Sequence, residues 1–425
     1  MMKTKLVGLF LTVLNLHFAA ASRAGEDYVA HEWGTFTSVQ GADGVQLEWN
    51  PLSVSELPSF VHSRGKSVVA GTKSMATLQR METPVIYFYS GQERSVDVTV
   101  NFPQGIMTEW YPQVRQKPAT DPKAPALIGR SVLRWDQVRV LPWAENRALA
   151  ATLPGDTSGS HYYAARDTDA DLLRVLADEP PPRTGTQTQW EKFLFYRGVG
   201  SFRAPLTVTL GDDGDEVQLR NAGAEPLSHL FIYTVQQGRG KFLQVDRLDA
   251  GESKAVKLAD EKQLLPLSEL RLRLAAQMQT ALVREGLYAR EAAAMVQTWD
   301  DSWFAEPGLR VLYTLPRAWT DRILPLTLEP APREVARVMV GRAEMITPSM
   351  EWALMKQVVR YSDRDERTRA SAVTGARAIG LGRFLEPATR RLMAKMPSAE
   401  FAQAASGLLM AAGKPSGEAK PLAAK

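Results

Sequence analysis

The segment SVDVTVNF, residues 95–102, decides the fold class that we expect for this chain. Every second residue is apolar, which is the period of two typical of a strand with one buried face. The apolar positions are Val96, Val98, Val100 and Phe102. Burial of each large apolar side chain contributes about 1.5 to 3 kcal/mol, and a slip of one residue would expose all of them. The pattern predicts a strand of fixed register in a mainly β fold.

Two further segments extend this prediction toward the N-terminus. VIYFYS at 85–90 is apolar on both faces, so we expect a central or doubly covered strand after Pro84. HEWGTFTS at 31–38 mixes polar and apolar residues on both faces. Such a strand lies at a domain junction or lines a cleft.

The pattern divides the chain into several regions. Residues 25–189 are expected to form an N-terminal β-sandwich-like domain with proline-rich insertions, ending in a linker, DEPPPRTGTQTQ, at 178–189. Within it, TDADLLRVLADE at 168–179 resembles a short helix, because Thr168 and Asp171 have the spacing of a capping box. Residues 190–260 contain six short apolar runs, which predict a six-stranded immunoglobulin-like sandwich.

The C-terminal part is mixed α/β and then α-helical. Over 261–345 we expect a helical hairpin, broken at Gly286, followed by strands that close a sheet with an earlier domain. Over 346–411 we expect helices, the first beginning at Thr347 as N-cap with Pro348 in the first turn. Residues 412–425 are expected to be a disordered tail.

The first residues indicate export. A basic head with Lys3 and Lys5 precedes the apolar run LVGLFLTVLNL and small residues, the pattern of a signal peptide at 1–24. The apolar run is shorter than the roughly 20 residues that span a bilayer. We expect a protein without a transmembrane segment after cleavage, exported to the periplasm or the extracellular space.

Composition argues against several classes of protein. Loss of Lys3, Lys5 and Arg23 with the signal peptide leaves 48 basic residues against 47 acidic ones, so no basic stripe favours nucleic acid. The chain has no cysteine, which excludes disulfides and thiolate chemistry. Motifs for zincins, α/β-hydrolases and nucleotide binding are lacking, because His31-Glu32 does not extend to H-E-x-x-H and no G-x-S-x-G, Walker or G-x-G-x-x-G motif occurs. We expect neither a cofactor nor a metal ion.

Glutamate and tryptophan recur side by side near the N-terminus, at 32–33, 48–49 and 109–110. Neighbouring residues of a strand point to opposite faces, so each glutamate lies opposite its tryptophan. In the simpler interpretation Trp33, Trp49 and Trp110 are core residues and the glutamates face water. In the alternative, carboxylates from different strands share one hollow and catalyse glycan hydrolysis; the candidates are Glu32, Glu82 and Glu109.

Other side chains are candidates for ligand binding. His31 shares a strand face with Trp33, and Arg80 is a potential partner for a buried Glu32, as are Arg134 and Lys73. The loop GDTSGSHYYAARD at 155–167 gathers rings and hydrogen-bond donors, and from it we select His161, Tyr162 and Arg166.

Three functions are consistent with the sequence. The leading one is an envelope or periplasmic binding or structural module, whose partner is a glycan or another cell-envelope component. The second is the glycan-active hydrolase described above. The third is a metal-assisted hydrolase built from His31, His161 and a carboxylate.

Overall fold

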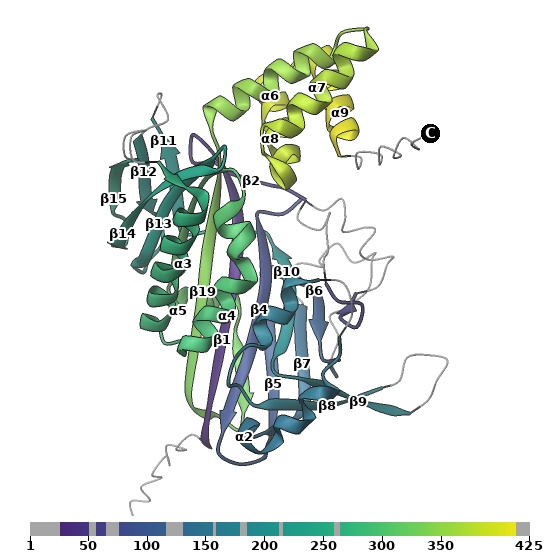
Figure 1. The fold of residues 1–425 in the computed structure, drawn as a ribbon, viewed down its shortest axis with the longest axis vertical. Helices are drawn as coiled ribbons and strands as arrows, with labels where there is room; N and C mark the ends of the chain where they lie inside the picture. Colours follow the sequence, from purple (N-terminus) through teal and green to yellow (C-terminus); the bar gives the residue numbers. More distant parts are fainter. Residues whose placement is uncertain are drawn as a thin grey trace, which may run out of the picture.

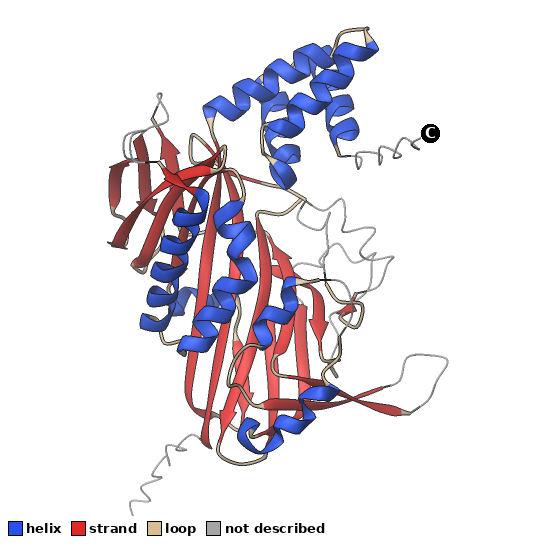
Figure 2. Cartoon of the chain, viewed as in Figure 1, coloured by secondary structure: helices blue, strands red, loops and turns tan. Residues whose placement is uncertain are grey.

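A computed structural model describes residues 26–50, 57–64, 76–115, 131–155, 159–178, 185–211, 216–258 and 264–413. The expected signal peptide, Lys73 and residues 414–425 of the expected tail lie outside these ranges. Within them the protein is mainly β with a helical C-terminal part, as the sequence predicts (Figure 2).

An eleven-stranded sheet forms the centre of the described structure (Figure 1). Its order is β16 (Leu265–Pro266), β14 (Arg239–Leu248), β13 (Leu227–Gln236), β17 (Gly308–Leu315), β19 (Pro332–Ile346), β1 (Glu26–Gly41), β4 (Gln79–Ser90), β10 (Leu194–Gly200), β6 (Gly105–Tyr111) and β3 (His62–Ser63), with β2 (Gln46–Leu47) paired to β1. The sheet joins strands from three ranges that the sequence suggested as separate domains. The division into domains stays a prediction.

Strand β1 contains HEWGTFTS and lies in the middle of this sheet. It pairs in parallel with β19 on one side and antiparallel with β4 on the other. Both neighbours are long and buried, and β4 contains VIYFYS, so the expected central strand is confirmed. Because β1 is covered on both faces, its mixed polar and apolar residues are all buried from Tyr28 to Gly41.

A second, five-stranded sheet has the order β18 (Leu326–Glu329), β5 (Arg94–Phe102), β7 (Ser131–Leu141), β8 (Leu172–Asp178) and β9 (Thr186–Glu191). β5 is SVDVTVNF with Arg94 before it, and its strict alternation of buried and half-buried residues confirms the predicted strand. Its apolar side chains share one core with a face of the large sheet.

The expected helix at 168–179 is wrong. Residues 172–178 form strand β8, which pairs with β7 and β9, and these long-range ladders prevail over the local capping signal. The expected linker at 178–189 is partly strand as well, because β9 begins at Thr186.

The six strands expected over 190–260 are present, but they divide between two sheets. β10, β13 and β14 belong to the large sheet, whereas β11 (Leu206–Leu210), β12 (Glu216–Asn221) and β15 (Ser253–Lys257) form a three-stranded sheet. The smaller sheet packs on the large one through the same core. The two-layer arrangement is therefore present without being a separate unit of six strands.

Helices cover the other face of the large sheet (Figure 1). α3 (Leu267–Arg284) and α4 (Ala289–Asp300) form the expected hairpin, and Gly286 between them has φ of 112°, which favours glycine. Turn η2 (His161–Arg166) and the π-helical turn η4 (Asp301–Ala305) pack beside them. This face is called the helix face below.

The C-terminal helices form a bundle at one end of the molecule, with a core of their own (Figure 2). They are α6 (Pro348–Tyr361), α7 (Glu366–Ala378), α8 (Leu385–Lys395) and α9 (Ala399–Ala412), with turn η5 (Gly382–Phe384) before α8. The Thr347 hydroxyl accepts a hydrogen bond from the Met350 amide, which confirms the predicted N-cap. The Trp49 ring packs against the Phe384 ring, with 5.3 Å between the ring centres, and so joins the bundle to the β part.

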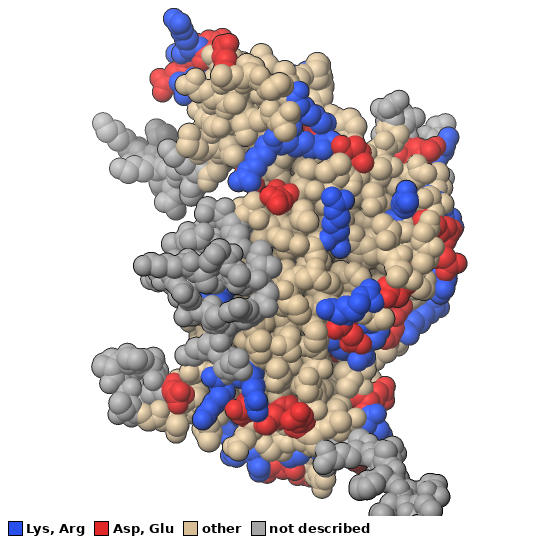
Figure 3. Space-filling model, turned by 180° about the vertical axis from the view of Figure 1, so that it is seen from behind, with Lys and Arg blue, Asp and Glu red and all other residues tan. Residues whose placement is uncertain are grey.

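Among the described residues, no helix is both long and apolar enough to cross a membrane. On the face shown in Figure 3, Lys and Arg side chains lie in small groups, many of them beside Asp and Glu. The prediction that the protein does not bind nucleic acid stays untested.

Candidate functional site

A cavity of about 510 Å³ opens on the helix face, where the large sheet, the helices that cover it and the C-terminal bundle meet. Four of the residues selected from the sequence line it, namely Arg80, Glu82, His161 and Tyr162. The other lining residues are Leu57, Thr83, Ser160, Arg197, Trp299, Asp301, Ser302, Ala305, Glu306 and Arg383. Ligand sites form preferentially at such junctions, and this volume lies in their usual range.

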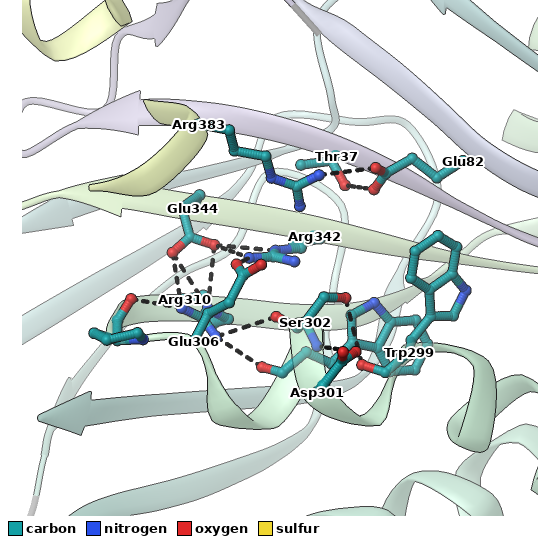
Figure 4. Close-up of polar contacts among 12 residues, drawn as sticks. Thr37, Glu82, Trp299, Asp301, Ser302, Glu306, Arg310, Arg342, Glu344 and Arg383 are labelled. Carbon is teal, nitrogen blue, oxygen red and sulfur yellow. Dashed lines mark hydrogen bonds and ion pairs between the residues drawn. The ribbon is translucent and has the colours of Figure 1, made fainter. Parts of the chain in front are cut away.

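Glu82 is the buried carboxylate of the cavity lining, and Figure 4 shows its contacts with Thr37 and Arg383. Its oxygens accept hydrogen bonds from the Thr37 hydroxyl at 2.6 Å and from Arg383 Nη1 at 2.9 Å, and Arg80 Nε lies 3.2 Å away. Burial alone would raise its pKa, but Arg383, Arg80 and Thr37 hold the pKa of Glu82 well below its usual range. Glu82 therefore stays ionised and cannot serve as a general acid.

The backbone beside Glu82 is strained. Thr83 has φ of 50°, a left-handed conformation that a β-branched residue rarely adopts. The pairing register between β1 and β4 shifts at this point, between Trp33 and Thr35 on β1. Strain of this kind costs about 1 to 3 kcal/mol and is concentrated at functional sites.

Three arginines come together around the cavity. Arg80 lies on β4, Arg197 on the adjacent strand β10, and Arg383 on turn η5 of the C-terminal bundle. Burial, together with the like charges of Arg197 and Arg383, lowers the pKa of Arg80 to about 10, although Glu82 opposes this change. The cavity lining therefore brings three guanidinium groups close together around one buried carboxylate, Glu82.

Arg197 differs from the other two because no carboxylate of the described residues pairs with it. Its side chain is 8% exposed and its Nε atom is buried without a hydrogen-bond partner. Its guanidinium carbon lies 6.0 Å from the centre of the Phe195 ring, which is a weak cation–π contact. Burial of a cation without an anion is costly, which distinguishes Arg197 from the paired arginines of the cavity.

A second group of charges supports one wall of the cavity (Figure 4). Glu344 accepts hydrogen bonds from Arg310, at 3.0 to 3.2 Å, and from Arg342, at 2.8 and 3.0 Å. Arg342 also donates to Glu306, a lining residue, at 2.6 Å. These ion pairs are internal and hold turn η4 against β17 and β19.

A pair of partly exposed residues lies at the rim of the cavity. His161 Nε2 on η2 is 3.2 Å from the Asp301 carboxylate on η4, and the two side chains are 43% and 56% exposed. Asp301 begins the π-helical turn, a distortion that occurs frequently at functional sites.

The remaining glutamates do not all share this cavity. Glu32 lies on the opposite face of β1, where it accepts hydrogen bonds from Arg337 Nε at 2.5 Å and from the Tyr196 hydroxyl. Its partner is therefore Arg337 and none of the residues that we considered from the sequence. Glu109 lies opposite Arg197 in the ladder between β6 and β10, and its charge acts on Arg80 from there. The hypothesis required two of the three glutamates to share one hollow, and Glu32 does not face this cavity.

The side chains of His31 and Arg166 are engaged elsewhere. His31 is buried with Nδ1 2.8 Å from Glu291 on α4, and its ring packs on Tyr288. Arg166 forms a bidentate pair with the buried Glu191, which also accepts a hydrogen bond from the Tyr162 hydroxyl at 3.0 Å. Tyr162 therefore presents no free hydroxyl, although its ring lines the cavity.

The three tryptophans expected in the core are there, since Trp33, Trp49 and Trp110 are at most 3% exposed. The matching expectation that the glutamates beside them face water is wrong for Glu32, which is fully buried. Within the described ranges no group of three His, Cys, Asp or Glu side chains is placed to hold a metal ion, so the hypothesis built on His31 and His161 lacks its ligand set.

The sequence did not single out several residues of the cavity, above all Arg197, Trp299, Asp301, Glu306 and Arg383. They lie on three segments far apart in the chain, around residues 197, 299–306 and 383, and none forms a motif with its neighbours. One signal was available in the sequence: Arg197 in YRGVG and Arg383 in LGRFL each lie next to a glycine within an otherwise apolar run.

Comparison with known proteins finds only distant structural similarity. No family model and no curated protein matches the sequence. Among solved structures, the Fcho1 Mu homology domain of Danio rerio with bound Eps15 peptide matches at 7% identity and a TM-score of 0.29, covering 76% of this chain and 98% of that one. The yeast delta-COP-I mu-homology domain complexed with Dsl1 WxWxV peptide matches at 6% identity and a TM-score of 0.25, covering 76% and 97%. At these scores the likeness supports neither a shared fold nor a shared ligand.

Proposed function

We propose that this protein is an exported binding module that holds a small anionic ligand in the cavity between Arg80, Arg197 and Arg383. The observation that carries the proposal is Arg197, a buried guanidinium that lines the cavity and has no carboxylate partner among the described residues.

The unpartnered guanidinium nitrogens of Arg197 and Arg383 favour an anion over other ligands. Three guanidinium groups face one buried carboxylate, Glu82, and Arg383 Nε and Nη2 are also buried without partners. Buried donors that lack acceptors cost about 1 to 3 kcal/mol each, more when charged. A carboxylate or a phosphate accepts from a guanidinium through two parallel hydrogen bonds, so an anion would satisfy these donors.

The construction of the cavity is consistent with binding. Its walls come from the large sheet, turns η2 and η4 and the C-terminal bundle, so a bound anion would contact parts of the chain that are far apart in sequence. The strained Thr83 and the π-helical turn both lie in its wall. Strained backbone is concentrated at ligand-binding and active sites, so its presence beside this charged cavity supports a binding function.

Two parts of the proposal rest on sequence alone. These are the signal peptide at 1–24 with export to the periplasm or the outside, and an immunoglobulin-like topology within 190–260. The alternative of a glycan-active hydrolase receives less support. Glu32 lies on the other face of the sheet, Glu82 is held ionised by its arginines, and Glu109 is not among the lining residues of the cavity.

Calorimetric titration of the purified protein with acetate, sulfate and phosphate at low ionic strength tests the proposal. We expect saturable binding of at least one anion, and at least a tenfold loss of affinity in R197Q. R203Q is the matched control, since Arg203 is exposed and lies outside the cavity. Failure of every anion to bind, or equal affinity of R197Q and wild type, would overturn the proposal.

Stability without ligand gives a second readout. If Arg197 is kept for a ligand, R197Q removes an uncompensated buried charge and the ligand-free variant unfolds at the same or a higher temperature than wild type. If Arg197 has only a structural role, R197Q unfolds at a lower temperature.

A further inference from the structure

The lining of the cavity carries both signs of charge, and this limits the ligand more than the arginines alone do. Asp301 and Glu306 line the cavity together with Glu82, so three carboxylates face the same space as the three arginines. An ion with two or three negative charges, such as sulfate or phosphate, would meet repulsion from them at short range. Among anions, one with a single negative charge meets the least repulsion.

The unpartnered groups of the lining are all hydrogen-bond donors. In addition to Arg197 Nε and the two Arg383 nitrogens, the indole Nε1 of Trp299 is buried without a partner. Trp299 is a donor only, and guanidinium groups accept no hydrogen bonds. The ligand therefore supplies several acceptors, more than one carboxylate alone can place around the cavity.

The carboxylates at the rim require the opposite kind of group. Asp301 is paired with His161, and Glu306 is paired with Arg342 through one oxygen, but both side chains remain 40% or more exposed. They have lone pairs available for a donor from the ligand. Hydroxyl groups donate and accept, so a hydroxyl-rich ligand satisfies both the unpartnered donors and these carboxylates.

The size and rings of the cavity favour a cyclic molecule. Its volume of about 510 Å³ is far more than an inorganic ion fills. The rings of Trp299 and Tyr162 provide apolar surface between the charged groups. Aromatic rings pack on the apolar faces of pyranoses, whose hydroxyl groups remain free for hydrogen bonds at the ring edge.

We infer that the ligand is a sugar acid, that is, a pyranose ring that carries one carboxylate. The inference rests on the anion-binding function proposed above. The carboxylate binds Arg197 and the ring lies against Trp299 and Tyr162. The hydroxyls at the ring edge reach the Trp299 N–H group, Arg383 and the carboxylates of Asp301 and Glu306. Each group of the lining that lacks a partner then has one of suitable polarity.

Titration with four probes tests the inference: D-glucuronate, D-glucose, acetate and sulfate, each with the full-length protein at the same ionic strength. Glucuronate has both the ring and the charge, glucose has only the ring, and acetate has only the charge. We expect glucuronate to bind at least tenfold more tightly than each of the other three. R197Q should reduce the affinity for glucuronate at least tenfold, to the level of glucose.

Two substitutions of Trp299 separate the ring from its donor. W299F keeps a ring and loses the N–H group, so a twofold to fivefold loss is expected; W299L loses the ring and should abolish the preference for glucuronate over acetate. R203Q is the control, and circular dichroism verifies that each variant is folded.

The outcomes distinguish this inference from the proposed function. If acetate or sulfate binds as tightly as glucuronate and R197Q abolishes binding, the anion site stands and the sugar acid is wrong. If glucose binds as tightly as glucuronate and R197Q has no effect, both are wrong and the cavity is a neutral sugar site. Failure of all four probes overturns both.

Discussion

Glu32 and Arg337 form an ion pair in the interior, with 2.5 Å between Arg337 Nε and the Glu32 carboxylate and both side chains at most 1% exposed. The pair joins β1 to β19, strands from opposite ends of the chain that lie side by side in parallel. The Tyr196 hydroxyl donates to the same carboxylate.

We expect E32Q to destabilise the protein by about 3 to 5 kcal/mol, because it removes the buried carboxylate that pairs with Arg337 and leaves it only the partly exposed Asp321 among the described residues. The measurement is the free energy of unfolding in urea. D27N is the control, since Asp27 pairs with Arg333 at the surface, with side chains 86% and 64% exposed, and no resolvable change is expected there. A small effect of E32Q would contradict the prediction and show that Asp321, 2.7 Å from Arg337 Nη1, is a sufficient counter-ion.

Loss of the Glu82 charge is expected to destabilise the cavity itself. E82Q removes the negative charge that lies close to both Arg80 and Arg383, while the like charges of Arg197 and Arg383 still act on Arg80. We expect the free energy of unfolding to fall by about 3 to 5 kcal/mol. Since the folded pKa of Glu82 lies below its usual value, its stabilisation is present above about pH 4.5 and is lost on acidification. The free energy of unfolding of E82Q, measured in urea, should accordingly change less with pH below 4.5 than that of wild type.

Added anion should restore part of this stability. If the cavity binds anions, acetate or glucuronate raises the unfolding temperature of E82Q more than that of wild type, because it replaces the lost carboxylate. E93Q is a suitable control, as Glu93 forms only a surface pair with Arg139. Equal shifts in all three proteins would contradict the prediction.

Gly341 is expected to be intolerant of any side chain. It lies on β19 opposite Tyr313, and a Cβ atom added there would be 2.3 Å from the Tyr313 ring, which is buried. We expect G341A to cost about 1 to 3 kcal/mol through displacement of that ring. Chemical denaturation of both variants measures this cost. G155A is the control, because a Cβ atom added at Gly155 would meet nothing within 4 Å.

Asp171 is expected to make stability depend on pH in the opposite sense to Glu82. Burial raises its pKa from 3.8 to about 6, although its carboxylate accepts hydrogen bonds from the Ser90 and Trp143 amides. The folded protein thus holds this proton more tightly than the unfolded chain. The resulting stabilisation is present below about pH 4 and is lost as the pH rises through about 6.

The free energy of unfolding at pH 4.5 and 7.5 tests this prediction. Relative to D171N, wild type should lose at most about 3 kcal/mol between the lower and the higher pH. D178N is the control, because Asp178 at the end of β8 is exposed. If the difference in the free energy of unfolding between wild type and D171N were the same at both pH values, the prediction would be contradicted.

Local patterns predicted much of the secondary structure. Alternation in SVDVTVNF gave β5 and its buried face, and Thr347 marked the start of α6. The same rule placed Glu32 and Trp33 on opposite faces of one strand, as they are. These features depend on residues within about one turn or one strand, which the sequence displays directly.

Local signals failed where distant strands competed with them. Thr168 and Asp171 have the spacing of a helix start, yet the following residues gain more from pairing with β7 and β9. The two sheets of the 190–260 region were also not foreseeable, since β13 pairs with β17, which is some 80 residues further along the chain.

The sequence by itself determined the mainly β character, the helical C-terminal part and the candidates Arg80, Glu82, His161 and Tyr162. Only the tertiary structure decided which charges meet. Arg337 reaches Glu32 across 305 residues, and Arg383 reaches Glu82 across 301. The physical reason is that the burial of a charge depends on a partner, and the partner is chosen by the pairing of strands and the docking of helices, which no local pattern encodes.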